Sequence, residues 1–311
     1  MKVSVCITTK NEKKEDIYKL LDSLSKQTLT LDEVIIVDAD KNSKIPKLKN
    51  SKQFKNLKII NSKNVSRAEG RNLAIKMAKN EIIAITDVGC VPRKDWLEKL
   101  VLRFHSGRRS SYVVAGGYKM IARNNFQKAC SNFLGVKQKD MNDTFMPSAR
   151  SMAFTKIIWK KAGGFPEKLK NTAEDTLFNV NLIKAGAKFA VQKNAIVEWG
   201  MPNTVKSFYL KVKNYATGDA ESGIWWHPIK RFQSHNIKIV SIYLRYIIGL
   251  LLLVFSFKFF VFTLLLYILI TLYLSYSYKK AGTWGPILQI VSDFAVMTGF
   301  LRGILKSCVK I

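Results

Sequence analysis

The sequence predicts an α/β domain built on a doubly wound sheet, followed by apolar C-terminal helices. Two observations lead to this prediction. Short runs of β-branched residues alternate with helical patterns in the first part of the 311-residue chain, and such alternation is typical of βαβ units. From residue 237 onward the chain is far more apolar, which indicates a second part of a different kind.

Four apolar runs are expected to be buried parallel strands, because near-continuous β-branched runs suit strands that are covered on both faces. They are residues 3–9, 33–38, 57–60 and 82–86. Between them, apolar residues recur at helical spacing on two helix faces, one with Ile17, Leu20, Leu21 and Leu24 and one with Leu73, Ala74, Met77 and Ala78. We further expect helices over 94–105 and 174–185, and strands over 112–116, 149–154 and 188–198.

The C-terminal part predicts a membrane anchor. Residues 259–278 carry no charge and are long enough to cross a bilayer core; residues 239–257 are interrupted only by Arg245, which could snorkel. Basic residues flank both ends, so the positive-inside tendency favours a hairpin over about 239–278 with both flanks cytosolic. One long helix buried in a partner protein is the alternative.

Apolar residues then recur at helical spacing over about 286–306, which predicts an amphipathic helix in the membrane interface. We therefore expect a catalytic domain over 1–225 and an anchor over 226–311, at the cell membrane with the catalytic domain on the cytoplasmic side. The paired Trp225 and Trp226 are typical of an interfacial belt. No signal peptide is expected, because residues 3–7 have strand character.

Charge and cysteine content narrow the class of function. The net charge is +29, and residues 1–236 hold 43 basic and 21 acidic side chains. The lysines are scattered, and no basic run interleaves with aromatic residues, so we expect anionic lipids or phosphate-bearing substrates rather than nucleic acid as partners. The four cysteines are widely spaced, which indicates a reducing compartment without disulfides or a zinc site.

Polar residues follow three of the expected strands. Thr8 and Thr9 end the first, Asp38 ends the second and Asp87 follows the fourth. Ligands of open α/β sheets bind at the carboxyl ends of the strands, so we expect these side chains to share one rim. An isolated Asp at such a place is often only a turn former, but two on one rim favour a binding site.

A helix is expected to begin near Ser66 at the same rim. Its N–H groups and dipole suit an anion, and Arg67 and Arg71 add forked donors for phosphate. Ser66 and Glu69 also fit a capping box, which explains part of the pattern by helix initiation alone.

Asp87 is the candidate ligand for Mg²⁺ or Mn²⁺, which would neutralise a diphosphate leaving group. The residue two places on is Gly89, so the usual second carboxylate is missing. His227 is a possible additional ligand.

Glu174 and Asp175 open another expected helix. Thr172 and Asp175 fit a capping box, and acids favour helix N-termini; alternatively, one carboxylate is a general base.

Taken together, the sequence resembles the family 2 glycosyltransferases of the GT-A fold over roughly residues 1–220. The resemblance lies in the segments 3–12, 33–38, Ser66-Arg-Ala-Glu-Gly-Arg-Asn72, 83–90, Gly163-Gly-Phe165 and Ala173-Glu-Asp-Thr176. It implies a nucleotide-sugar site made by Thr8, Glu12, Asp38, Arg71, Asp87 and Glu174. It further implies that Asp87 is the first acid of the metal-binding D-x-D motif and that Asp175 is the catalytic base.

The resemblance implies an inverting transferase that moves one sugar from a UDP- or GDP-linked donor to a membrane-held acceptor, such as a lipid-linked glycan. The Q-x-x-R-W signature of processive synthases is absent after Glu198-Trp199, so a non-processive, membrane-anchored type is expected. Two alternatives stay open: a polyprenyl-phosphate sugar synthase, and a catalytically silent membrane scaffold suggested by Gly89.

Overall fold

The protein is described by a computed structural model. It describes residues 1–40, 45, 54, 56–104, 113–170, 172–229, 231, 233–277 and 283–308. The chain forms two compact units. Unit 1 comprises Met1–Met120 and Val136–Gly200, and unit 2 comprises Ile121–Gly135 and Met201–Ile311. The expected boundary after residue 225, between a catalytic domain and a membrane anchor, stays a prediction.

Unit 1 is built on an eight-stranded sheet with the order β3-β2-β1-β4-β7-β6-β8-β5. In chain order its strands are β1 Val3–Thr9, β2 Glu33–Asp38, β3 Leu57–Asn61, β4 Ile82–Ile85, β5 Cys90–Pro92, β6 Val113–Ile121, β7 Met152–Thr155 and β8 Phe189–Gly200. The first four are parallel neighbours, as the sequence predicts. Strand β2 is buried at every position, which explains its unbroken apolar run.

The second half of the sheet differs from a doubly wound arrangement. Strand β7 is antiparallel to β4 and to β6, and β5 is antiparallel to β8. Antiparallel neighbours do not need a crossover that returns the chain to the same end of the sheet, so the chain can run back in the opposite direction. The sheet is therefore mixed, and the expectation of a doubly wound sheet was wrong for this half.

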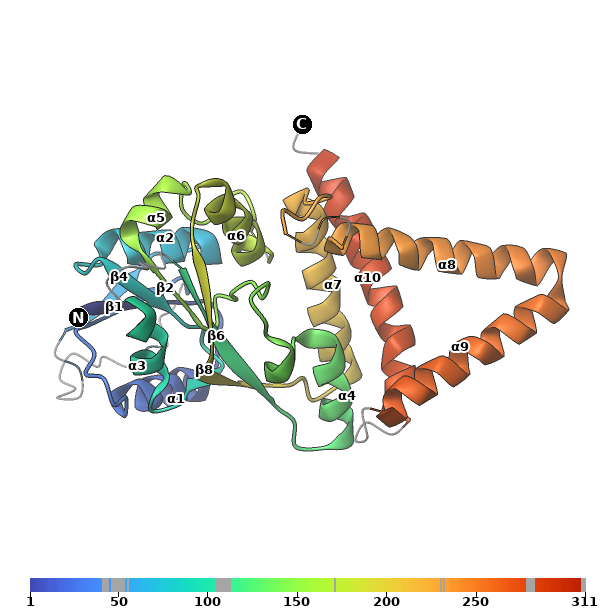
Figure 1. Ribbon diagram of the computed structural model, residues 1–311, viewed down its shortest axis with the longest axis horizontal. Helices are drawn as coiled ribbons and strands as arrows, with labels where there is room; N and C mark the ends of the chain where they lie inside the picture. The colour runs from blue at the N-terminus through green and yellow to red at the C-terminus, as the bar shows by residue number, and fades with distance from the viewer. Residues whose placement is uncertain are drawn as a thin grey trace. The chain divides into compact units, whose positions relative to one another are not determined.

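Helices cover both faces of the sheet (Figure 1). Helices α2 Arg67–Met77, α5 Lys156–Lys161 and α6 Glu174–Lys184 lie on one face, and α1 Lys14–Ser25 and α3 Trp96–Val101 lie on the other. Side chains from α2, α5 and α6 join the buried residues of β1, β2, β4 and β7 in one apolar core. This core holds in place the N-terminal ends of α2 and α6, where candidate site residues lie.

Unit 2 consists of α4 Asn125–Leu134, α7 Val205–Ser222, α8 His235–Phe255, α9 Phe257–Ser277 and α10 Trp284–Cys308. Helices α7 and α10 run parallel in close contact, because Gly299 faces Lys213 and Gly303 faces Thr217. A Cβ at Gly303 would lie 2.5 Å from the carbonyl oxygen of Thr217. Only glycine permits this approach.

Two of the described helices, α8 and α10, are long and apolar enough to cross a membrane, and α9 adds the shorter apolar stretch Phe257–Tyr273. Helix α10 packs one side on α7 and exposes an apolar stripe made by Ile287, Ile290, Phe294, Leu301 and Leu305. This agrees with the amphipathic pattern expected over 286–306. Its place in a membrane interface stays a prediction.

Arg245 does not extend away from the helices as expected for a snorkelling side chain. Its guanidinium donates to the buried carboxylate of Asp293 on α10 at 2.5 Å. The hydroxyls of Tyr246 and Tyr267 and the amide of Gln289 donate to the same carboxylate. The pairing makes snorkelling unnecessary, because a charge among apolar helices is stabilised by an opposite charge.

Candidate functional site

The sheet register brings the expected rim residues together. Thr9 is opposite Asp38 in β1 and β2, and Cys6 is opposite Ile85 in β1 and β4. Asp87 follows Ile85 by two residues, so Thr8, Asp38 and Asp87 lie at the same carboxyl edge. This edge is the ligand-binding side of an open α/β sheet.

Several buried polar atoms of this edge have no hydrogen-bond partner within the described residues: Thr8 Oγ1, Thr9 Oγ1, Asp38 Oδ2 and Thr86 Oγ1. Buried polar atoms are normally paired in native proteins. Asp38 is 1% exposed, and its other oxygen accepts from the backbone N–H of Asp40 at 3.1 Å. The edge is therefore suited to the polar groups of a bound ligand.

The loop after β1 adds Glu12 to the same region. Asn11 has a left-handed backbone (φ 57°), and its N–H donates to Asp40. Burial, opposed by Arg67 and reinforced by Asp87, raises the pKa of Glu12 above its usual range. The place of Glu12 in the nucleotide-sugar site stays a prediction. Asp40, which the sequence did not single out, belongs to the same group.

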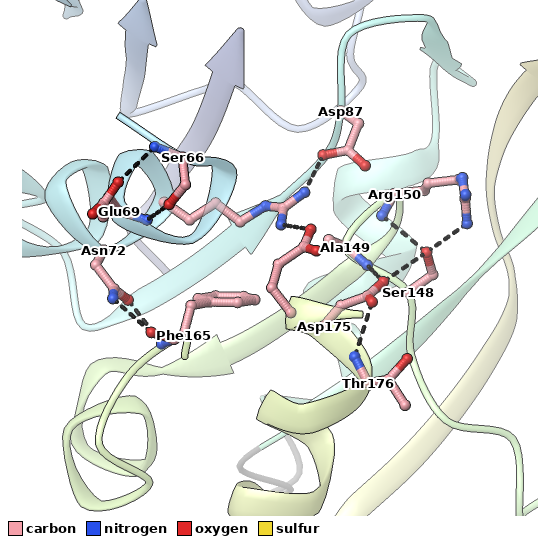
Figure 2. Close-up of polar contacts among 12 residues, drawn as sticks. Ser66, Glu69, Asn72, Asp87, Ser148, Ala149, Arg150, Phe165, Asp175 and Thr176 are labelled. Atoms are coloured by element: carbon pink, nitrogen blue, oxygen red, sulfur yellow. Dashed lines mark hydrogen bonds and ion pairs between the residues drawn. The ribbon is translucent and has the colours of Figure 1, made fainter. Parts of the chain in front are cut away.

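Helix α2 begins with the expected capping box. Ser66 accepts from the N–H of Glu69, and Glu69 accepts from the N–H of Ser66 (Figure 2). Glu69 also accepts from Lys170 at 2.5 Å, and these two hydrogen bonds, that of Lys170 above all, lower its pKa to about 2. Gly70 on the next turn lies against Thr8: a Cβ there would be 2.4 Å from the Thr8 methyl group.

A buried ion-pair triad joins three segments of the predicted site. The two terminal nitrogens of Arg71 donate to Asp87 at 2.7 Å and to Glu174 at 2.5 Å (Figure 2). Arg71 and Glu174 are 2% and 7% exposed, whereas Asp87 is 31% exposed. Burial opposes ionisation of Asp87, but Arg71, with Arg150 and Arg67, more than offsets it and lowers the pKa of Asp87. Asp87 is therefore an ionised carboxylate that is exposed enough to face a ligand.

Asn72 fixes the loop that leads to this triad. Its side chain accepts from the backbone N–H of Phe165 at 2.8 Å and from the indole of Trp159 at 3.1 Å, and it donates to the carbonyl of Phe165 at 2.9 Å. Gly164 has φ 74°, and a Cβ there would be 3.0 Å from Asn72. The Phe165 ring stacks on Phe178 of α6 at 4.1 Å. The segments 71–72 and 163–165 thus hold the start of α6 in place.

Asp175 is held by the loop that precedes β7. One carboxylate oxygen accepts from the N–H of Ala149 at 3.2 Å and from the hydroxyl of Ser148 at 3.4 Å. The other accepts from the N–H of Thr176 at 2.8 Å. Asp175 is half-buried, so it is oriented and still accessible.

The capping-box interpretation of Asp175 was wrong. Helix α6 begins after Ala173, which has a left-handed backbone (φ 66°) and makes no side-chain cap bond. Thr172 is therefore not the N-cap residue. A left-handed conformation costs a non-glycine residue about 1–2 kcal/mol, and it turns Glu174 toward Arg71 and Asp175 toward Ser148.

Arg150 is a site residue that the sequence analysis did not identify. Its guanidinium stacks on Trp199, with Cζ 3.9 Å from the ring centroid, and it donates to Ser148 at 2.8 Å. Tyr118 lies edge-on to Trp199 and 5.8 Å from the same guanidinium. Figure 2 shows Arg150 beside Ser148 and Asp175. No local signal marks this arginine, because strands β6, β7 and β8 must assemble before its neighbours meet.

The described residues contain no group of three His, Cys, Asp or Glu side chains that could hold a metal ion. Gly89 has φ 87° and supplies no side-chain ligand beside Asp87. His227 belongs to unit 2, and its Nδ1 accepts from the N–H of Ile229. As far as the structure describes the chain, its residues thus do not fit a metal held by the protein alone.

Two curated proteins are similar to this chain in sequence. An O-antigen chain rhamnosyltransferase, RfbN of Salmonella typhimurium, is 28% identical over 217 residues, which cover 63% of this chain and 66% of the relative. An uncharacterised glycosyltransferase of Methanocaldococcus jannaschii is 24% identical over 209 residues, covering 65% and 71%. The chain thus spans about two thirds of the length of the curated relatives that it matches.

Two solved structures share the fold. The mannosyltransferase PcManGT of Pyrobaculum calidifontis, in complex with GDP-Man and Mn²⁺, has a TM-score of 0.59 at 16% identity and covers 99% of this chain and 87% of its own. The fragment 1–349 of S. aureus TarS with UDP-GlcNAc has a TM-score of 0.50 at 21% identity and covers 70% and 66%.

The expected GT-A-type architecture is thereby confirmed. Residues 4–161, about half of the chain, match the family described as glycosyl transferase family 2. The chain belongs to glycosyl transferase family 2.

Proposed function

We propose that the protein transfers one sugar, with inversion, from a nucleotide-sugar donor to a membrane-held acceptor, and that Asp175 is the catalytic base. The observation that carries this proposal is the orientation of Asp175. Three donors hold its carboxylate half-exposed beside the rim that Asp87 and Arg71 define. A general base needs such a fixed and accessible position.

The proposed chemistry is a single displacement. The Asp175 carboxylate takes the proton of an acceptor hydroxyl, and the hydroxyl oxygen forms a bond to the anomeric carbon of the donor sugar. The bond between that carbon and the diphosphate oxygen breaks, and its electron pair stays on the diphosphate. One carboxylate suffices, because no covalent glycosyl intermediate forms.

The nucleotide is proposed to lie along the rim. Thr8, Glu12 and Asp38 would contact the base and ribose, which agrees with the buried polar atoms there that have no partner within the described residues. Glu174 is buried and bound to Arg71, so we assign both Glu174 and Arg71 a role in positioning Asp87. Three sugar donors are candidates. GDP-Man and UDP-GlcNAc are bound in the similar structures, and the name of the Salmonella relative indicates a rhamnose donor.

The membrane-held acceptor is supported by unit 2. Helix α8 exposes apolar side chains along its length, and Trp225 and Trp226, just before it, are 47% and 53% exposed. Exposed apolar helices preceded by exposed tryptophans suit a bilayer and its interface. The proposal includes a catalytic domain over 1–225 and a membrane anchor over 226–311. It also places the catalytic domain on the cytoplasmic side of the membrane. Lys230, Lys279 and Lys280, which support that placement, lie outside the described residues.

Two other functions predict different results. A polyprenyl-phosphate sugar synthase would join the sugar to phosphate rather than to another sugar, and a silent scaffold would bind no nucleotide sugar. The orientation of Asp175 favours an enzyme, since a scaffold needs no such carboxylate.

The test is nucleoside diphosphate release by the purified full chain in detergent. GDP-mannose, UDP-GlcNAc and nucleotide-linked rhamnose are each supplied with and without lipid-linked saccharides. We expect release with one donor that depends on a lipid-linked saccharide. Transfer to bare polyprenyl phosphate would favour the synthase, and absence of binding to every donor in calorimetry would favour the scaffold.

A further inference from the structure

We propose that Arg150, rather than a metal held by a D-x-D pair, supplies the cationic contact to the donor diphosphate in this chain. The proposal rests on the proposed function, because it concerns how the same site stabilises the leaving group. It starts from the charges that the described residues place around Asp87.

The buried triad carries a net negative charge, so binding of a diphosphate beside it needs another cation. Arg71 is paired with both Asp87 and Glu174, so the three side chains together carry a formal charge of about −1 when ionised. Asp175 adds a further carboxylate nearby. A nucleoside diphosphate brings more negative charge, and repulsion in a partly buried site is poorly screened. Transfer therefore requires positive charge beyond Arg71.

Few side chains beside Asp87 could bind a metal ion. Asp87 already accepts from Arg71 through one oxygen, and Gly89 offers no carboxylate in the position two residues on. Mg²⁺ and Mn²⁺ prefer several oxygen ligands, of which one or two are usually protein carboxylates. The donor set available at Asp87 is the minimum for such an ion.

Arg150 is placed to take this role. Its stacking on Trp199 at 3.9 Å and its hydrogen bond to Ser148 fix the side chain before a ligand binds. Ser148 in turn donates to Asp175, so the guanidinium and the proposed base are linked through one hydroxyl (Figure 2). Figure 2 shows Arg150 and Asp87 in the same part of the site.

The chemistry of the guanidinium suits the leaving group. Its planar fork can donate two hydrogen bonds to two phosphate oxygens. These donors would stabilise the charge that develops on the diphosphate as the bond to the sugar breaks, which is where preorganised donors contribute most. Because stacking leaves the edge of a guanidinium accessible to acceptors, contact with Trp199 does not preclude this role.

Calorimetry on the full chain in detergent tests the proposal. UDP and GDP are titrated in EDTA and in Mn²⁺, and uridine and guanosine serve as probes that lack the diphosphate. We expect wild-type protein to bind one diphosphate in EDTA. Arg150→Met should weaken that binding by about tenfold to a hundredfold, the range for a lost charged hydrogen bond, and change nucleoside affinity by less than about twofold.

Matched variants keep the result interpretable. Arg93→Met removes another unit 1 arginine, paired with Glu198 at 3.2 Å on the surface, and should bind as wild type does. Arg150→Lys keeps the charge but loses the forked pair of donors, so it should bind the diphosphate more weakly than wild type and more tightly than Arg150→Met. Thermal melting of each variant identifies any that fails to fold. Wild-type affinity in Arg150→Lys or Arg150→Met, or diphosphate binding that requires Mn²⁺, would overturn the proposal. No binding of any nucleotide by wild type would instead reject the proposed function itself.

Discussion

Replacement of Asn72 by alanine should loosen the loop that positions the catalytic segment. The change removes the partner of three buried groups, the Trp159 indole and the backbone N–H and carbonyl of Phe165, and also a hydrogen bond to the exposed Glu167. Phe165 is 1% exposed, so water cannot easily replace the lost hydrogen bonds. Each unsatisfied buried group costs about 1–3 kcal/mol, and partial relaxation makes a total of about 3 kcal/mol the expected loss.

Amide hydrogen exchange on the full chain measures this loss locally. In Asn72→Ala, exchange of the Phe165 amide should accelerate about a hundredfold, since each 1.4 kcal/mol corresponds to a factor of ten. Asn56→Ala is the matched control: Asn56 is exposed and donates one hydrogen bond to the carbonyl of Asp32 at 2.9 Å, so its effect should stay within about 0.5 kcal/mol. Equal protection of the Phe165 amide in wild type and Asn72→Ala would refute the reasoning.

Three further outcomes are expected. Because hydrogen bonds from a lysine and from the backbone lower the pKa of Glu69 to about 2, its carboxylate stabilises the fold above the unfolded value of about 4.3. Melting should show that Glu69→Gln costs up to about 1 kcal/mol at pH 7 and that this cost shrinks below about pH 4 and is lost as the pH falls through about 2. Gly303→Leu should separate α10 from α7, seen as faster proteolysis of α10 in detergent, whereas Gly249→Leu, whose Cβ would meet nothing within 4 Å, should not. Gly89→Asp in the Arg150→Met background should make diphosphate binding respond to Mn²⁺ in calorimetry, because it adds a second carboxylate two residues after Asp87. No atom lies within 4 Å of the added Cβ, but the φ of 87° strains a non-glycine residue, so melting first confirms that the variant folds.

The parallel half of the sheet was predictable because its signals are local. The run Glu33–Asp38 is buried at every position, so burial on both faces leaves a continuous apolar segment in the sequence. The polar residues that end such strands then fall at one edge. This is why Thr8, Asp38 and Asp87 could be placed together without a structure.

The antiparallel half was not predictable in the same way. Neither the direction of β7 nor its position between β4 and β6 is set by its own four residues, because both depend on which partner edge is available. Arg150 was missed for this reason, since Trp199 and Tyr118 reach it only from other strands. The left-handed backbone of Ala173 likewise could not be read from the sequence, because the local pattern at Thr172 is typical of a helix cap.

In unit 2, spacing identified the helices but not their partners. The apolar positions of 286–306 predicted an amphipathic helix, yet the contact of Gly299 and Gly303 with α7 depends on the backbone of a distant polar helix. Arg245 and Asp293 each stand as an isolated charge in a different apolar segment. Their pairing at 2.5 Å shows that an isolated charge in an apolar helix is best interpreted together with charges on neighbouring helices.

The role of Asp175 is the central claim, and separating the turnover number from donor affinity in Asp175→Asn tests it most directly. The amide keeps the size of the side chain, and its single oxygen can still accept from Ala149 or from Thr176, which donate to different oxygens of Asp175, but it cannot take a proton. With the accepted donor and a lipid-linked acceptor, we expect kcat to fall by at least about a hundredfold, the lower range for loss of a general base, with donor Kd unchanged. A kcat equal to that of wild type in Asp175→Asn would contradict the assignment.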